Sequence, residues 1–346
     1  MPEFLPLLSP DSISAIALIW LQFVLCVGVI GVAGVRLSRY CDATAVLTGR
    51  SRNWIGLILI ATVTSLPELV TGLSAVTVAA APDIAVGDAL GSCVFNLAIL
   101  ALVDLVYRKG AISAFAGSGH VMSAVFGVIL LSGVVLAILL SAQGVMPSVG
   151  HVSFASVAIV VLYLVAMRAL YLTEQRNTGT IVAERPGTRL KAALMGFGVH
   201  SAVIVGAGVW LPLSGVELAR VMGWSHSFVG TLFVAFATSV PELATTWGAV
   251  GIGAIDRAIG NLPGSNLFDV LIPAIDYFAC LPGPISMHVS PLQALSAGAA
   301  CLMGGVVILA QAYRPVARVW HTASQASLVL PGLCLLDAVA LDRHGG

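Results

Sequence analysis

The chain has 346 residues, of which 58% are hydrophobic and 9% are charged, and its formal net charge is zero. Ordinary soluble domains contain about 25% charged residues, so this composition excludes a soluble globular protein. The lack of a basic excess also argues against a nucleic-acid partner. Apolar runs of about 20 residues occur throughout, whereas the alternating ten-residue segments of membrane barrels are absent. The composition therefore predicts an all-α polytopic membrane protein with the lipid bilayer as its surroundings.

Ten segments have the length and the apolar character that a transmembrane helix needs. In chain order, the expected spans are residues 13–35, 55–80, 84–106, 121–141, 152–172, 190–211, 228–250, 258–278, 291–311 and 323–339. The tenth span contains Pro331 and carries Asp337 near its end. The longest polar connection, residues 173–189, separates the fifth span from the sixth. We therefore expect a first five-helix repeat at residues 1–172, a cytoplasmic linker at 173–189 and a second five-helix repeat at 190–346.

The positions of the basic residues support this count of spans. Those near the loops that follow odd-numbered spans are Arg36, Arg39, Arg50, Arg52, Arg108, Lys109, Arg168, Arg176, Arg185, Arg189, Lys191, Arg257, Arg314 and Arg318. Only Arg220 and Arg343 lie on the other side. Loops rich in lysine and arginine stay in the cytoplasm, so both termini are expected outside the plasma (inner) membrane.

Because five is an odd number, the second half of the chain starts on the opposite side of the membrane from the first. The two halves should therefore form an inverted-topology repeat. In transporters, such repeats place substrate and coupling ions at their interface near the middle of the bilayer.

A polar motif within the apolar spans occurs once in each half. Residues 61–76, ATVTSLPELVTGLSAV, resemble residues 235–250, AFATSVPELATTWGAV. Residues 86–99, VGDALGSCVFNLAI, resemble residues 259–272, IGNLPGSNLFDVLI. Ionisable side chains in a membrane segment are costly and by default indicate function. The register of the two copies therefore indicates one site that is built twice.

The side chains of this motif all offer oxygen atoms. On a helix, Glu68 lies one turn after Thr64 and beside Ser65. Pro67 disturbs the preceding turn and should free backbone carbonyls near Ala61 and Val63. The positions of the two copies that offer oxygen are Ala61, Thr64, Ser65, Glu68, Ser92, Asn96, Ala235, Thr238, Ser239, Glu242, Ser265 and Asp269, with carbonyls near the two alanines. Glycine pairs before Ser92 and Ser265 should allow close helix approach.

Oxygen-only sites suit hard cations such as Ca²⁺. The acids Glu68, Glu242 and Asp269 supply up to three negative charges, which one Ca²⁺ or several Na⁺ ions could neutralise. Competition for shared carboxylates is then a physical route to exchange.

Each residue also has a purely structural interpretation. A serine or threonine in a spanning helix usually bonds a carbonyl of its own helix, and a single Glu68 could be a buried neutral acid. Recurrence of the polar positions in register favours a site. Asp88 is either a peripheral ligand or a hydrogen-bonding residue between helices, and its counterpart is Asn261. Asp104 and Asp276 are expected at the membrane interface.

At these residues the chain resembles the cation/Ca²⁺ exchanger superfamily, which includes the sodium/calcium exchangers. The two repeats of that superfamily carry G-T-S-x-P-E followed by G-N-x-x-G-S-N-x-x-[ND]. Here, Val63 and Ala237 replace the glycine, Asp88 and Cys93 replace asparagines, and Pro263 lies within the second motif. The resemblance implies an alternating-access antiporter with its ion ligands at the positions named above, including the carbonyls of the two alanines.

The function expected from these observations is the exchange of Ca²⁺ for Na⁺ by a secondary-active antiporter. A cation/H⁺ antiporter, in which Glu68 and Glu242 would carry protons, is the main alternative, because a carboxylate binds either ion. A passive divalent-cation channel fits the inverted halves less well. An enzyme is not expected, because the chain has no HExxH or Gly-x-Ser-x-Gly motif. The transported ions are inorganic cations and no cofactor is expected.

Overall fold

The computed structural model describes residues 13–48, 62–107, 112–115, 117–149, 152–174, 187–279, 289–313 and 324–344. Its principal helices are α1 (Ile13–Leu47), α3 (Leu66–Thr77), α4 (Pro82–Val106), α5 (Ser118–Ala142), α6 (Phe154–Glu174), α7 (Leu190–Met222), α10 (Val240–Gly251), α11 (Ile255–Ala279), α12 (Gln293–Tyr313) and α13 (Gln325–His344). Three short segments precede α10: α8 (His226–Phe228), the π-helix η2 (Val229–Val234) and α9 (Ala235–Thr238).

All ten expected spans have a helical counterpart in these ranges, although residues 55–61 of the second span lie outside the described residues. Six of the described helices are long and apolar enough to cross a membrane, and the bent pair His226–Thr238 and Val240–Gly251 adds a seventh. The prediction of an all-helical membrane protein is therefore confirmed, with one small exception. A two-stranded antiparallel hairpin, β1 (Ser148–Val149) and β2 (Val152–Ser153), joins α5 to α6.

Two helices are longer than the sequence predicted. The first span was expected to end at residue 35, but α1 continues to Leu47. The sixth was expected to end at residue 211, but α7 continues to Met222 and stops where Gly223 adopts a left-handed φ of +70°. The extra turns of α1 are stabilised by packing, because Leu37 and Cys41 share a buried cluster with Ile204 of α7. Arg36 and Arg39 consequently lie on α1 and not in the loop after the first span, which begins later in the chain than predicted.

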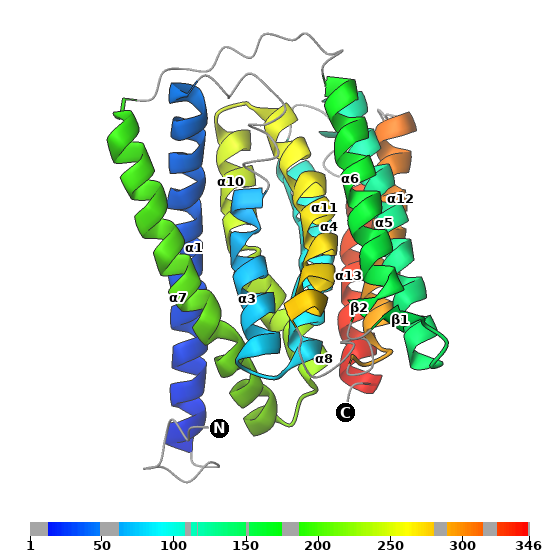
Figure 1. The fold of residues 1–346 in the computed structure, drawn as a ribbon. Coiled ribbons are helices and arrows are strands. Elements are labelled where there is room, and N and C mark those ends of the chain that lie inside the picture. Colours follow the sequence, from blue (N-terminus) through cyan, green and yellow to red (C-terminus); the bar gives the residue numbers. More distant parts are fainter. Residues whose placement is uncertain are drawn as a thin grey trace.

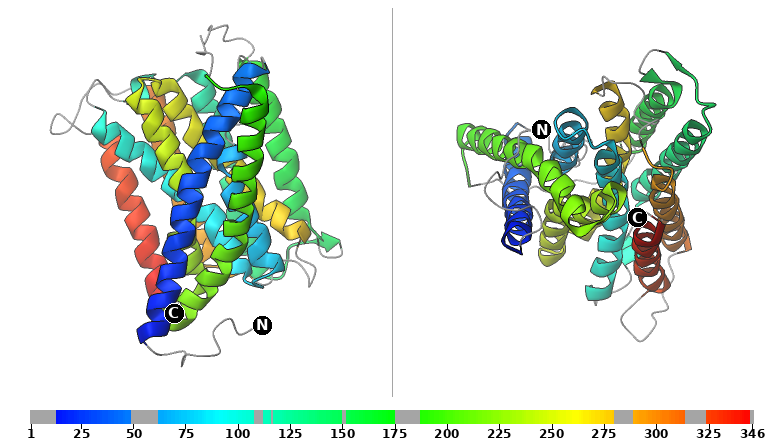
Figure 2. Two further views of the ribbon diagram at one scale, coloured as in Figure 1. Left: turned by 90° about the vertical axis from the view of Figure 1, so that its left-hand side faces the viewer. Right: turned by 90° about the horizontal axis from the view of Figure 1, so that it is seen from below.

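The two halves of the bundle run in opposite directions (Figure 1). In this view α1, α4 and α6 run upward, whereas their counterparts α7, α11 and α13 run downward. The broken span α8–α10 runs upward, opposite to α3. The start of α1 and the end of α13 lie at the same lower face in two views (Figures 1 and 2). The expected inverted arrangement of two five-helix repeats is thus confirmed.

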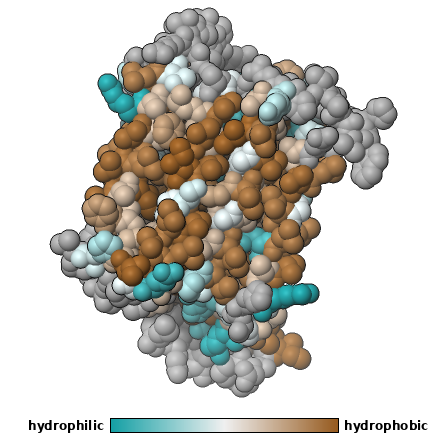
Figure 3. All heavy atoms as spheres, turned by 90° about the vertical axis from the view of Figure 1, so that its right-hand side faces the viewer, coloured by the Kyte–Doolittle hydropathy of each residue, from teal (hydrophilic) through white to brown (hydrophobic). Residues whose placement is uncertain are grey.

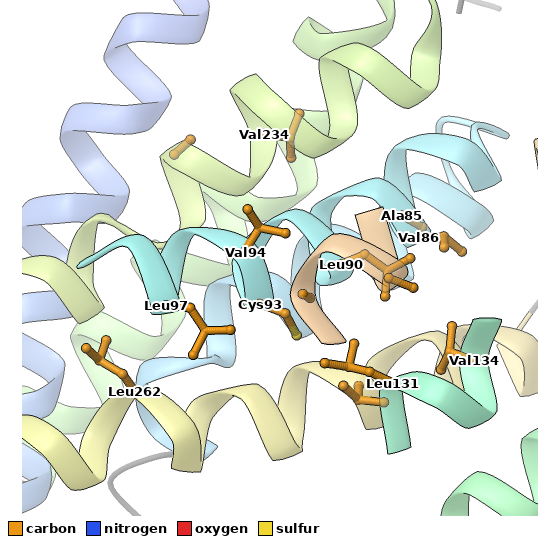
Figure 4. Packing of buried hydrophobic residues seen from close by; sticks show 14 of the residues in the cluster. Ala85, Val86, Leu90, Cys93, Val94, Leu97, Leu131, Val134, Val234 and Leu262 are labelled. Carbon is orange, nitrogen blue, oxygen red and sulfur yellow. The ribbon is translucent and has the colours of Figure 1, made fainter. Parts of the chain in front are cut away.

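Helix α4 forms the centre of the fold. Of its most apolar 18-residue stretch 72% is buried, compared with 17% for α6 and for α7. Leu90 and Cys93 of α4 are fully buried, and Leu131 of α5, Val234 of η2 and Leu262 of α11 lie around the same helix (Figure 4). Polar groups on α4 are therefore held away from lipid.

The periphery of the bundle is apolar instead of charged. Figure 3 shows hydrophobic side chains across the middle of one face, with hydrophilic residues gathered mostly toward its upper and lower edges. Exposed side chains on the outer helices include Leu136, Val161 and Leu302. Such a band suits contact with acyl chains, and it agrees with a multi-pass membrane protein.

Candidate cation-binding site

Both copies of the Thr-Ser-x-Pro-Glu motif interrupt a helix at the serine. Ser65 separates a helical turn at residues 62–64 from α3, and its backbone has φ −85° and ψ 14°. Ser239 separates α9 from α10, and the axis bends by 41° there. Proline follows two residues after each serine and lacks the N–H that would bond the preceding turn. The sequence thus places the start of a helix, with Glu68 or Glu242 in its first turn, deep inside the bundle.

The glycine-containing helix of the first repeat, α4, packs closely against the segment that leads to the break at Ser239. A Cβ atom at Gly91 would lie 2.2 Å from the Thr231 carbonyl oxygen, and one at Gly87 would lie 2.9 Å from the Thr231 nitrogen. No side chain larger than hydrogen fits at such distances. The predicted role of these two glycines is therefore confirmed, since they let α4 pack directly on the backbone of η2.

The three acids of the motif are almost completely buried. Glu68 is 1% exposed, and both Glu242 and Asp269 are 0% exposed. Glu242 and Asp269 are close enough to Glu68 to act on it electrostatically. Thr64 approaches the carboxyl group of Glu242, and Ser65 approaches that of Asp269, so the hydroxyls of the first repeat meet the acids of the second.

Hydroxyl groups link the two repeats to each other. Thr64 Oγ1 lies 3.3 Å from Ser265 Oγ, and Ser92 Oγ lies 3.4 Å from Thr238 Oγ1. Ser239 Oγ donates to Ser92 Oγ over 3.2 Å. Each motif therefore contacts the other copy instead of standing alone.

Amide groups complete this contact. Asn96 Nδ2 donates to Asp269 Oδ2 at 3.2 Å and to Asn266 Oδ1 at 2.9 Å. Asn266 Nδ2 in turn donates to the carbonyl of Cys93 at 3.2 Å. Asn266 was not among the predicted site residues. The sequence feature that could have indicated it is its position directly after Ser265 in Gly-Ser-Asn, where the first repeat has Cys93.

Several buried oxygens at this centre have no hydrogen-bond partner among the described residues. They are Ser65 Oγ, Glu68 Oε2, Asp88 Oδ2, Asn96 Oδ1, Asp269 Oδ1 and both carboxyl oxygens of Glu242. Buried polar groups without partners are costly, and a buried charge is more so. A cation or a proton would remove that cost. Within the described ranges, no three His, Cys, Asp or Glu side chains are close enough to hold one metal ion, so a bound ion would also need hydroxyl, amide or carbonyl oxygens.

Of the two predicted carbonyl ligands, one can be assessed. Ala61 lies outside the described residues. The carbonyl of Ala235 is not freed as expected, because it accepts hydrogen bonds from Ser239 N at 3.0 Å and from Thr238 Oγ1 at 3.1 Å. Pro241 removes the donor for the carbonyl of Ala237, one α-helical turn earlier, and not for that of Ala235.

Three further acids are also buried. Asp88 is 1% exposed and accepts a 2.7 Å hydrogen bond from Thr238 Oγ1. It therefore connects α4 to α9, in agreement with its interpretation as a hydrogen-bonding residue between helices. Asp104 and Asp276 are 6% and 0% exposed, so both are covered by protein, and their position near the membrane interface stays a prediction. Asp104 accepts from the backbone N–H of Ile112 at 2.7 Å and from the Ser327 hydroxyl, which places it inside the contact between α4 and α13.

Proteins with similar sequences include one described as an inner membrane protein. Over 231 residues, 63% of this chain, the sequence is 29% identical to the inner membrane protein YrbG of Escherichia coli (strain K12). That segment spans 66% of the E. coli protein, so the chain matches about two thirds of the relative's length.

Two solved structures share the fold. The H⁺/Ca²⁺ exchanger CAX has a TM-score of 0.66 at 14% identity, over 94% of this chain and 86% of that one. The sodium-calcium exchanger NCX_Mj has a TM-score of 0.59 at 20% identity, over 94% and 98%. The profile of the family described as "Sodium/calcium exchanger protein" matches twice, at residues 18–172 and 192–336, once in each repeat. The chain therefore belongs to the sodium/calcium exchanger protein family.

Proposed function

We propose that this protein is a secondary-active antiporter that exchanges Ca²⁺ for Na⁺ at the interface of its two repeats. The proposal rests above all on one observation, the buried acids that have unpartnered carboxyl oxygens at the meeting point of two broken helices. Its proposed ion ligands are Thr64, Ser65, Glu68, Ser92, Asn96, Thr238, Ser239, Glu242, Ser265 and Asp269, together with the carbonyl of Ala61. The Ala235 carbonyl can join them only by giving up one of the hydrogen bonds that it accepts from Ser239 N and Thr238 Oγ1.

The arrangement supports ion competition in a specific way. Hard oxygens from carboxylates, hydroxyls and amides suit Ca²⁺ and Na⁺ equally in type. One divalent ion neutralises two carboxylates at once, whereas Na⁺ ions neutralise them singly. Because the acids are buried and near one another, removing one ion species without supplying the other leaves uncompensated charge. Exchange is then favoured over uncoupled leak.

The second candidate is a Ca²⁺/H⁺ antiporter, because a proton also neutralises a buried carboxylate. The fold resembles both a protein described as a sodium-calcium exchanger and one described as an H⁺/Ca²⁺ exchanger. We favour Na⁺ because the family profile that matches both repeats bears the description of sodium/calcium exchange. In either case the acids and the access route would be the same.

Uptake of ⁴⁵Ca²⁺ into proteoliposomes tests the proposal. Purified protein should accumulate Ca²⁺ when an outward Na⁺ gradient is imposed at a clamped membrane potential. A matched outward H⁺ gradient, with the vesicle interior acid and no Na⁺ present, should give little uptake. Uptake driven only by the pH gradient would establish the alternative. Uptake that persists without either gradient, down the Ca²⁺ gradient alone, would indicate a channel.

The proposed orientation has both termini outside and the linker at residues 173–189 in the cytoplasm. It rests on the distribution of basic residues and on the common face of the start of α1 and the end of α13. The proposed division of the chain is residues 1–172, 173–189 and 190–346. Tags near Met1 and within the linker should label from opposite sides of the membrane.

A further inference from the structure

Asp276 is a buried acid that the proposed exchange site does not use. It lies in the last turn of α11 and is 0% exposed. Neither Oδ1 nor Oδ2 has a hydrogen-bond partner among the described residues. It lies two helical turns beyond Asp269 and outside the repeated motif. A carboxyl group in this position needs a chemical explanation.

The carboxyl group lies directly against the backbone of α3. A Cβ atom at Gly72 would lie 2.5 Å from Asp276 Oδ2, so any other residue at 72 would displace the acid. Gly72 follows Glu68 by one turn on the same face of α3. Asp276 therefore contacts α3 one helical turn beyond Glu68, toward the side of the bundle where α11 ends and the two termini lie (Figure 1).

The ionisable groups around Asp276 bring it no positive charge. Asp88 on α4 acts on it electrostatically. The other helices packed against α11 carry further ionisable residues: Glu68 on α3, Glu242 on α10, His120 on α5, Asp83 and Asp104 on α4, and Tyr163, Arg168, Tyr171 and Glu174 on α6. Arg168 is exposed and lies toward the end of α6, which runs opposite to α11, so it is far from the last turn of α11 (Figure 1). His120 is bonded to Asp256 at the opposite end of α11. No described lysine, arginine or histidine forms an ion pair with Asp276.

The inverted repeat provides an internal control for this region. With the offsets of the two motifs, the counterparts of Gly72, Asp88 and Asp276 are Thr246, Asn261 and Val103. Those residues lie on the other side of the central site because the repeats run in opposite directions. There, Asn261 Nδ2 donates to Thr246 Oγ1 at 3.3 Å, and no carboxyl group is present among the three. Among these three pairs of counterparts, carboxyl groups occur only on the side that faces the termini.

An ionised carboxylate that is buried without donors or counter-ions is strongly disfavoured, and the group takes up a proton instead. Asp276 stands two helical turns from Asp269 and from the hydroxyl and amide groups around that acid. Within the described ranges, no three His, Cys, Asp or Glu side chains come together around Asp276. The chemistry of the position therefore selects a proton over Na⁺ or Ca²⁺.

We propose that Asp276 is a proton-binding site on the path between the central cation site and the face that carries the termini. It holds a proton while this path is closed and dry, and it releases the proton to water when the path opens. The proposal rests on the proposed exchange function, because only a transporter needs such a path. Acid at the face of the termini then favours the closed state and slows exchange from that side.

Transport with the pH varied on one side at a time tests this coupling. In right-side-out and inverted membrane vesicles, Na⁺-driven ⁴⁵Ca²⁺ uptake by the wild type should fall by up to about tenfold per pH unit on acidification of the termini side, the slope of one proton. Asp276→Asn should lose this dependence at that face only. Glu217→Gln removes an exposed acid from the last turns of α7 and should behave as wild type. Unchanged pH dependence in Asp276→Asn, with transport intact, would overturn the proposal and leave the exchange function standing.

Infrared spectroscopy of the purified protein gives a readout that needs no transport. The wild type near neutral pH should show a carbonyl band of a protonated carboxylic acid that Asp276→Asn lacks and Glu217→Gln keeps. If the asparagine variant does not fold, Asp276→Val copies the counterpart residue Val103 and serves the same purpose. An identical band in wild type and variant would show that Asp276 is ionised and contradict the proposal. Absence of Ca²⁺ exchange in wild type, with the band present, would instead count against the exchange function.

Discussion

The two repeats are alike in their hydroxyl groups and differ in their charges. Thr64 and Ser265 approach to 3.3 Å, and the symmetry-related pair Thr238 and Ser92 approach to 3.4 Å. At the next position the symmetry ends, because Asn96 of one repeat faces Asp269 of the other and donates to it at 3.2 Å. Two acids there would repel each other, whereas an amide donates to the acid and holds it in place. The hydroxyl groups of the two repeats are therefore arranged symmetrically, whereas the charged groups are not.

The largest expected effect comes from the acids that both repeats share. Glu68→Gln or Glu242→Gln should each reduce Ca²⁺ exchange by about 100-fold or more, because a buried divalent ion loses a full ligand charge. The measurement is initial ⁴⁵Ca²⁺ uptake in proteoliposomes at matched protein density. The exposed acid variant Glu217→Gln is the control. Near-normal flux in either glutamine variant would remove that residue from the site.

Smaller effects should follow where the repeats differ. Asp269→Asn should weaken Ca²⁺ binding about tenfold and Na⁺ binding less, because the Coulomb energy of a divalent ion is twice that of a monovalent one. Asn96→Asp should make Ca²⁺ binding more dependent on pH near neutrality, because crowded acids share protons. Both affinities would be measured by equilibrium binding between mildly acid and mildly alkaline pH. Equal losses for the two ions, together with an unchanged pH profile, would show that neither residue contacts the ion.

Packing between the repeats can be tested separately from charge. Gly91→Ala should destabilise the protein by about 1–3 kcal/mol, because the new methyl group meets the Thr231 carbonyl. Thermal inactivation in detergent would measure the loss. Gly28→Ala in α1 is the matched control, since a Cβ there has no atom within 4 Å in the described structure. Equal stability of the two variants would mean that α4 does not pack this tightly on η2.

The smallest effect is expected at the far end of α11, outside the apolar part of that helix. The hydrogen bond from His120 lowers the pKa of Asp256, and the two side chains lie 2.8 Å apart. A lowered carboxyl pKa contributes stability above the ordinary aspartate range, and this contribution is lost as the pH falls through the lowered pKa. Because the Asp256 side chain is 71% exposed, Asp256→Asn should cost only about 0.5 kcal/mol or less near neutral pH.

This last prediction is checked by comparing thermal inactivation of Asp256→Asn and wild type across the acid range. The difference should shrink as the pH drops. A difference that grows in acid would show that the ion pair has the opposite linkage.

The sequence was sufficient for most of the fold because membrane spans are long and apolar and the motif is repeated. It could not predict the extension of α1, since Leu37 and Cys41 become helical through contact with Ile204, far away in the chain. It missed Asn266 because that residue acts across the interface, on the backbone of Cys93. The sequence also could not show that Asp276 is buried against Gly72 of α3, because that contact joins residues far apart in the chain.

Equilibrium binding of Ca²⁺ to purified protein tests most directly whether the two repeats build one shared site. We predict one Ca²⁺ per chain, displaced by Na⁺, and loss of that binding in both Glu68→Gln and Glu242→Gln. If each repeat held its own ion, the wild type would bind two, and each single variant would keep one. That result would contradict the account of a site formed between the repeats.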